Sequence, residues 1–87
     1  MRLDKFLKVS RIIKRRTVAS EACGNQYISV NGKPAKASYV VRVGDIITVS
    51  YGSRNVSFRV KEINENAPKD KAAEMYEVLE GDPFGQP

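Results

Sequence analysis

The apolar residues at the start of the chain recur at the spacing of an amphipathic helix. Leu3, Phe6 and Leu7 stand at positions i, i+3 and i+4, which places them on one helix face. Asp4 falls in the first turn, where a carboxylate interacts favourably with the positive end of the helix dipole. The pattern predicts a first helix that ends near Ser10 and packs its apolar face into a core.

A second short helix is predicted after the basic triplet at residues 14–16. Thr17 is a suitable N-cap residue, and the Gly24-Asn25 pair is typical of a helix end. Between the two helices, Ile13 is expected to be a core residue. The predicted buried face of the second helix consists of Val18, Ala19, Ala22 and Cys23.

The middle of the chain has the pattern of antiparallel strands. An Asn-Gly pair follows the apolar residues 27–30, and this is a strong signal for a two-residue hairpin turn. Residues 46–51 are rich in β-branched side chains, and apolar and polar residues alternate over 56–61. We predict that these two strands pair through a turn at 52–53, whereas residues 39–41 fit a loop or a strand.

The last quarter of the chain is polar. A short helix is predicted over residues 69–75, followed by an extended segment that docks on the sheet. We divide the chain into a domain at residues 1–63, a docked acidic segment at 64–80 and a disordered tail at 81–87.

Charge is distributed unevenly over these segments. Residues 1–16 carry a net charge of +6, whereas the whole chain of 87 residues carries +5. Residues 1–61 hold thirteen Lys and Arg against three acidic residues, and residues 62–87 hold two against seven. Because like charges packed so densely repel one another, a polyanionic partner is expected. Nucleic acid is the first candidate, and an anionic membrane surface is the second.

The residue inventory argues against catalysis by this chain. It has no His, so it lacks the commonest general base and metal ligand, and its single Cys cannot form an internal disulfide. No glycine-rich phosphate loop and no apolar run of about 20 residues is present. We therefore expect a soluble cytoplasmic protein that is not an enzyme and uses neither cofactor nor metal.

Four short motifs resemble the S4 RNA-binding domain family. They are Arg-Leu-Asp-Lys-Phe-Leu at 2–7, Lys-Arg-Arg-Thr at 14–17, Val-Asn-Gly-Lys at 30–33 and Val-Gly-Asp at 43–45. The resemblance covers the first 50 or so residues. It implies an α+β fold of the S4 type, in which two short N-terminal helices pack on a small bent antiparallel sheet.

The chain is similar over its length to small free-standing members of this family. That resemblance implies a non-catalytic factor of bacterial ribosome-associated quality control. Such a factor binds obstructed large ribosomal subunits, contacts rRNA and peptidyl-tRNA, and supports alanine tailing of stalled chains, with the tailing factor as a further partner. It implies a monomer away from the ribosome. The alternatives are a heat-shock-type S4 protein that recycles large subunits carrying nascent chains, and a general RNA-binding or ribosome-assembly factor.

Arg2 and Arg16 stand at the positions that match the RNA-facing residues of the family. Their planar, permanently charged guanidinium groups suit phosphates and base edges. The triplet that ends at Arg16 also precedes a helix N-terminus, which favours a phosphate. The remaining residues are expected to supply a supporting field. The full predicted RNA-binding set is Arg2, Asp4, Lys5, Lys8, Arg11, Lys14, Arg15, Arg16, Lys33 and Lys36.

Three other hypotheses remain open from the sequence. A membrane-surface module would need a free apolar helix face, but the apolar face of the first helix is assigned to the core. A DNA-binding helix-turn-helix would prefer duplex DNA to structured RNA. A diffuse RNA chaperone would bind free RNA as well as it binds ribosomes.

The charge pattern predicts that binding to structured RNA depends steeply on salt. Each neutralised phosphate should steepen the fall of log K with log [salt] by about 0.7–0.9. Anisotropy titrations over a range of KCl concentrations measure this slope. A flat dependence would mean that residues 1–16 are not the binding surface.

Overall fold

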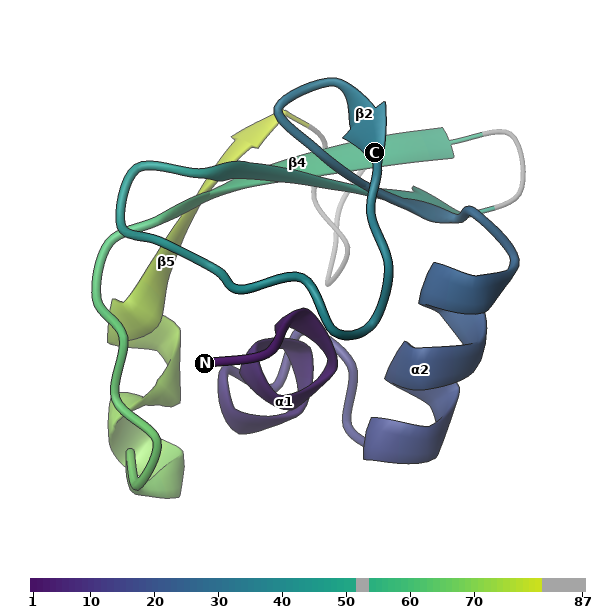
Figure 1. The fold of residues 1–87 in the computed structure, drawn as a ribbon. Helices are drawn as coiled ribbons and strands as arrows, with labels where there is room; N and C mark the ends of the chain where they lie inside the picture. The colour runs from purple at the N-terminus through teal and green to yellow at the C-terminus, as the bar shows by residue number, and fades with distance from the viewer. Residues whose placement is uncertain (52–53, 81–87) are drawn as a thin grey trace.

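The helices pack against one face of an antiparallel sheet, as a computed structural model shows for residues 1–51 and 54–80 (Figure 1). The five strands lie in the order β2-β1-β3-β4-β5. The prediction of an α+β fold with two N-terminal helices on a small antiparallel sheet is confirmed. The elements are α1 (Leu3–Val9), α2 (Arg16–Gly24), β1 (Ile28–Val30), β2 (Lys33–Pro34), β3 (Ile46–Tyr51), β4 (Arg54–Val60), the 3-10 helix η1 (Lys69–Met75) and β5 (Tyr76–Glu80).

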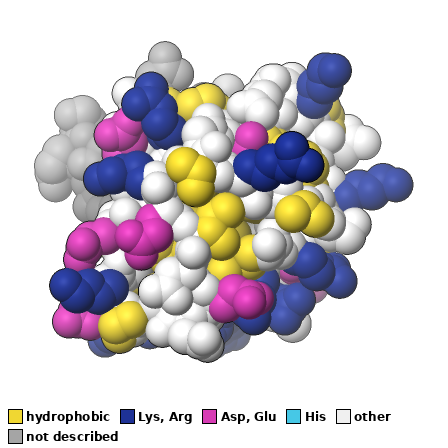
Figure 2. All heavy atoms as spheres, turned by 60° about the vertical axis from the view of Figure 1, so that its left-hand side comes forward, with side chains coloured by type: hydrophobic (Ala, Val, Ile, Leu, Met, Phe, Trp, Pro, Cys, Tyr) yellow, Lys and Arg dark blue, Asp and Glu magenta, His cyan; other side chains and the backbone are white. Residues whose placement is uncertain are grey.

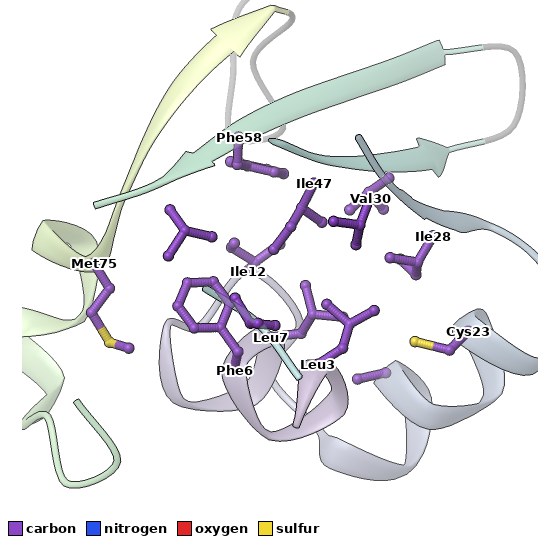
Figure 3. Close-up of a cluster of buried hydrophobic side chains, with 14 of the residues drawn as sticks. Leu3, Phe6, Leu7, Ile12, Cys23, Ile28, Val30, Ile47, Phe58 and Met75 are labelled. Atoms are coloured by element: carbon purple, nitrogen blue, oxygen red, sulfur yellow. The ribbon is translucent and has the colours of Figure 1, made fainter. Parts of the chain in front are cut away.

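Helix α1 lies under the sheet between α2 and η1 (Figure 1). Its apolar face forms the centre of the core, because Leu3, Phe6 and Leu7 are fully buried. These side chains point toward Ile47 and Phe58 of the sheet, with α2 and η1 on either side (Figure 3). Helix α1 ends at Val9 and has Ser10 as its C-cap, so the predicted helix end is confirmed.

The structure corrects two details of α2. The prediction of Thr17 as the N-cap is wrong, because the helix already begins at Arg16 and Arg15 occupies the cap position. The predicted buried face is correct only in part, because Val18 is 47% exposed and Ala22 is partly buried, whereas Ala19 and Cys23 are buried as predicted. With Ala19 and Cys23 turned to the core, Val18 lies about 100° away around the helix axis.

The turn after α1 also differs from the prediction. Ile12 is the buried residue there, and Ile13 is only partly buried against the core. The cause is the backbone of Arg11, whose φ of 65° is in the left-handed region. This reversal directs Ile12 inward, and it is held by a hydrogen bond from the Ile13 N–H to the Leu7 carbonyl (3.0 Å).

The sheet confirms the predicted hairpin and strands. Strands β1 and β2 are antiparallel, and the turn between them has positive φ at Asn31 (53°) and Gly32 (86°). These are the signs that a type I′ turn requires. Strands β3 and β4 pair in register with Ile47 opposite Phe58. The predicted turn at residues 52–53 and the predicted disordered tail at 81–87 lie outside the residues that the structure describes.

The segment after residue 68 joins the sheet and the core. The predicted short helix is η1, and the predicted extended segment is strand β5, which pairs with β4. Met75 is fully buried, and the Tyr76 ring packs edge-on against Phe58 with centroids 5.2 Å apart. The β4–β5 pairing contains a register shift that leaves Leu79 as an extra residue in β5.

A buried carboxylate ties the loops above α1 to the sheet. Asp45 accepts hydrogen bonds from Asn31 Nδ2 (3.1 Å), the Tyr39 hydroxyl (2.9 Å) and the Arg42 N–H (3.0 Å). Burial opposes ionisation of Asp45, but these three donors prevail and hold its pKa below the ordinary value. The same loop binds α1, because the Leu3 N–H donates to the Tyr39 carbonyl (2.7 Å).

We expect Asp45→Asn to lower the free energy of unfolding by about 1–3 kcal/mol, because three donors lose their charged acceptor. The lowered folded-state pKa means that this stabilisation is present above the unfolded-state pKa and is lost as pH falls through the folded-state pKa. The variant should therefore lose less stability than the wild type on acidification, as urea unfolding across the acidic range would measure. Tyr39→Phe, which removes one donor, is the milder control. Equal acid sensitivity of Asp45→Asn and the wild type would contradict the assignment.

Candidate nucleic-acid interface

A buried carboxylate holds two exposed arginines beside each other. The Asp4 side chain is only 5% exposed, whereas those of Arg2 and Arg16 are 53% and 50% exposed. Arg2 Nε lies 3.3 Å from Asp4 Oδ1, and Arg2 Nη2 lies 3.4 Å from Oδ2. Arg16 Nε lies 3.5 Å from the same Oδ2. One negative charge thus faces two positive charges, and the group keeps a positive charge toward solvent.

The position of Asp4 follows from local structure at the N-terminus of α1. The Asp4 and Leu3 N–H groups donate to the carbonyls of Ala37 (3.2 Å) and Tyr39 (2.7 Å), which cap the helix in place of a side chain. The carboxylate also accepts from the Lys5 N–H at 2.8 Å. Asp4 is therefore fixed against α1 and presents its oxygens to Arg2 and to the first residue of α2.

This arrangement prepares the two arginines for binding an anion. Arg2 is held along one edge by two hydrogen bonds, and Arg16 is held by an ion pair through Nε, so less side-chain freedom is lost when a ligand engages their remaining N–H donors. A guanidinium fork suits a phosphate better than a lysine ammonium does. We refer to Arg2 and Arg16, together with the Asp4 carboxylate that holds them, as the arginine pair.

A second basic group lies at the other end of α1. Lys8, Arg11 and Lys14 line a pocket of about 370 Å³ together with Val9, Glu65 and Ala67. The Glu65 carboxylate accepts a hydrogen bond from Lys5 Nζ at 3.1 Å. This bond, and the charge of Lys5, hold the pKa of Glu65 below its usual range. We name this group the turn pocket.

The remaining predicted residues lie elsewhere. Lys33 is exposed on the edge strand β2, and Lys36 lines a pocket of about 500 Å³ beside Ser20 and Gly24 of α2. Arg15 is the exposed N-cap residue of α2. The ten predicted RNA-binding residues are thus divided among the arginine pair, the turn pocket with Lys5 bonded to Glu65 at its border, and the surface near α2 and β2. Their role as RNA contacts stays a prediction.

The sequence interpretation omitted Arg42, which tertiary contacts bring near the N-terminus. Arg2 forms a β-bridge with Val40, and the Val41 N–H donates to the Met1 carbonyl at 2.9 Å. Arg42 directly follows and is exposed. No local pattern in the sequence indicates this proximity, because forty residues separate Arg42 from Arg2.

On the side of the molecule that carries β5 and η1, acidic and basic side chains are intermixed (Figure 2). Acidic side chains gather toward one edge of that face, and the opposite edge carries mainly Lys and Arg.

Within residues 1–51 and 54–80 there is no group of three or more potential metal ligands. Among the helices of these residues, none is long and apolar enough to cross a bilayer.

Cys23 behaves as the small buried side chain that was predicted. It is 4% exposed at the packed face of α2. Burial, with a smaller effect from the negative charge of Asp4, raises the pKa of its thiol to about 11. The thiol is therefore protonated at neutral pH and is a poor nucleophile.

Comparisons with known proteins bear out the resemblance to the S4 family. The S4 domain family model matches residues 1–47. An RQC P-site tRNA stabilizing factor from Bacillus subtilis is 49% identical over 86 residues, covering 99% of this chain and 100% of that protein. A protein of the same name from Halalkalibacterium halodurans is 45% identical, with 99% and 98% covered. The trimeric structure of Vibrio cholerae Heat Shock Protein 15 matches with a TM-score of 0.82 at 28% identity, covering 91% of this chain and 81% of that chain.

We expect Asp4→Asn to weaken binding to structured RNA, even though it raises the net charge from +5 to +6. The loss should be about tenfold, because two arginines must then be ordered on binding at about 0.5–1.5 kcal/mol each. Fluorescence anisotropy with labelled tRNA measures the affinity, and circular dichroism verifies that the variant is folded. Asp70→Asn makes the same charge change on η1 and should bind slightly more tightly. Tighter binding by Asp4→Asn as well would show that Asp4 acts only through its charge.

Proposed function

The chain belongs to the S4 domain family, and from this we propose that it is a non-catalytic RNA-binding factor of bacterial ribosome-associated quality control. In this role it binds obstructed large (50S) ribosomal subunits in the cytoplasm and contacts both rRNA and peptidyl-tRNA. It thereby supports C-terminal alanine tailing of stalled nascent chains. Full-length relatives named RQC P-site tRNA stabilizing factors support the proposal. The single structural observation that carries it is the arginine pair held by Asp4.

The arginine pair suits the way in which proteins recognise folded RNA. The major groove of A-form RNA is deep and narrow, so contacts fall on the backbone, the 2′-hydroxyl groups and exposed loop bases. Outward N–H donors of Arg2 and Arg16 fit phosphates and base edges. Binding rather than chemistry also agrees with a chain that contains no His.

A small basic wedge can stabilise a tRNA without catalysing a step. If it contacts rRNA and peptidyl-tRNA together, it adds binding free energy to only one position of the tRNA. The population then shifts toward that position, because a ligand favours the state to which it binds more tightly. The tailing factor would act while the tRNA is held there. The protein itself is proposed to be a monomer away from the ribosome.

A second candidate function is the recycling of large subunits that still carry nascent chains. The TM-score of 0.82 to Heat Shock Protein 15 favours it. The two functions differ in outcome, since only the first requires alanine tails. Loss of alanine tails on stalled chains in cells without the protein would support the first function, and unchanged tailing would support the second.

We expect Arg2→Ala and Arg16→Ala each to weaken co-sedimentation with large subunits that carry peptidyl-tRNA. Each loss should be about tenfold or more, because a hydrogen bond to a charged group contributes about 1.5–3 kcal/mol. Lys69→Ala removes the same charge from η1 and serves as the matched control. Circular dichroism should show that all three variants are folded. Unchanged co-sedimentation of both arginine variants would refute the proposal.

A further inference from the structure

The turn between α1 and α2 holds an arginine in a backbone conformation that favours glycine. Arg11 has a φ of 65°, in the left-handed region, where the Cβ of an L-residue crowds the following carbonyl. The Arg11 N–H donates to the Lys8 carbonyl at 3.1 Å, which closes the last turn of α1. Glycine is the residue that most often occupies this place after a helix, so an arginine there has a conformational cost.

The side chain at this strained position lines the turn pocket with two other cations. Lys8 and Lys14 also line this pocket, and Glu65 is the one acidic residue among its described lining residues. Lys5 neutralises the charge of Glu65, because its Nζ lies 3.1 Å from Glu65 Oε1. Of the carboxylates in residues 1–51 and 54–79, none is within salt-bridge distance of Lys8, Arg11 or Lys14. Three positive charges therefore share one hollow with a single described carboxylate, which is already paired with Lys5.

The lining indicates what kind of ligand would enter. Among the described residues that line the turn pocket, none is aromatic, and the apolar ones are Val9 and Ala67. Such a surface offers no platform on which a base could stack. A guanidinium fork flanked by two ammonium groups instead matches the oxygens of a phosphate. A phosphate of the RNA backbone therefore fits better than a base or an apolar peptide.

We propose that Lys8, Arg11 and Lys14 form a second RNA-phosphate site, separate from the arginine pair and at the opposite end of α1. The inference rests on the proposed function, since it assumes that the protein binds RNA. At 1.5 Å per residue, the seven residues of α1 hold the two sites roughly 10 Å apart. The protein then grips two phosphates with one rigid helix, which fixes its orientation on the RNA.

The test uses a substitution for which stability and binding should change in opposite directions. In Arg11→Gly the backbone strain is relieved, so Tm should rise by roughly 4 °C. Affinity for labelled tRNA and for large subunits should fall by roughly tenfold, and the salt slope should become shallower by about 0.7–0.9. Lys69→Ala, the charge-matched control, should change neither Tm nor affinity to this extent. Arg11→Lys keeps the charge but loses the guanidinium fork, so it should retain part of the affinity and show no gain in Tm.

A double variant tests whether the two sites are separate. If they hold different phosphates, the losses in affinity of Arg11→Gly and Arg16→Ala should multiply in the double variant. If the double variant binds RNA as tightly as the single variant with the lower affinity, the claim of a separate site would be overturned. An Arg11→Gly protein that binds RNA as well as Lys69→Ala does would overturn the proposed phosphate site itself. Failure of the wild type to bind either RNA target would instead refute the proposed function.

Discussion

Asp4 is almost completely buried, yet it faces guanidinium groups that come from before α1 and from the start of α2. A buried carboxylate without partners would cost several kcal/mol, so the packing of the two helices and the placement of the arginines stabilise each other. The loop carbonyls of Ala37 and Tyr39 cap α1, which leaves the carboxylate free to reach the arginines. A change in the angle between α1 and α2 would therefore alter the binding surface as well as the core.

The acidic C-terminal part of the chain has a defined place in this arrangement. It contributes Met75 and Tyr76 to the packing around Phe58, so it supports the sheet over which α1 lies. It also places Glu65 beside Lys5, which matches one of the seven positive charges near the N-terminus. In the folded protein, Glu65 of the acidic part therefore lies at the border of the turn pocket and pairs with Lys5. The cations of the pocket remain available to bind an anion.

Local patterns predicted most of the secondary structure, and non-local contacts account for the rest. The spacing of Leu3, Phe6 and Leu7 predicted α1, and the Asn-Gly pair predicted the hairpin, because both signals act within a few residues. Thr17 failed as a cap because a cap contributes only about 0.5–2 kcal/mol, which tertiary packing can override. The left-handed Arg11, which turns Ile12 inward, has no signature because glycine is expected there. The resemblance to the S4 family implied Arg2 and Arg16 as candidates, but the position of the Asp4 carboxylate between them follows only from the packing of the two helices.

The extra residue in β5 has a consequence for the behaviour of the protein at high concentration. Strand β5 forms one edge of the sheet, and Val78 and Leu79 are both exposed there, at 42% and 41%. An apolar, regular edge strand could form hydrogen bonds with the corresponding strand of another molecule. The bulge at Leu79 breaks the even spacing of the free N–H and C=O groups, so a second edge cannot align along its whole length. The irregularity therefore disfavours pairing of this edge of the sheet with a strand of another molecule.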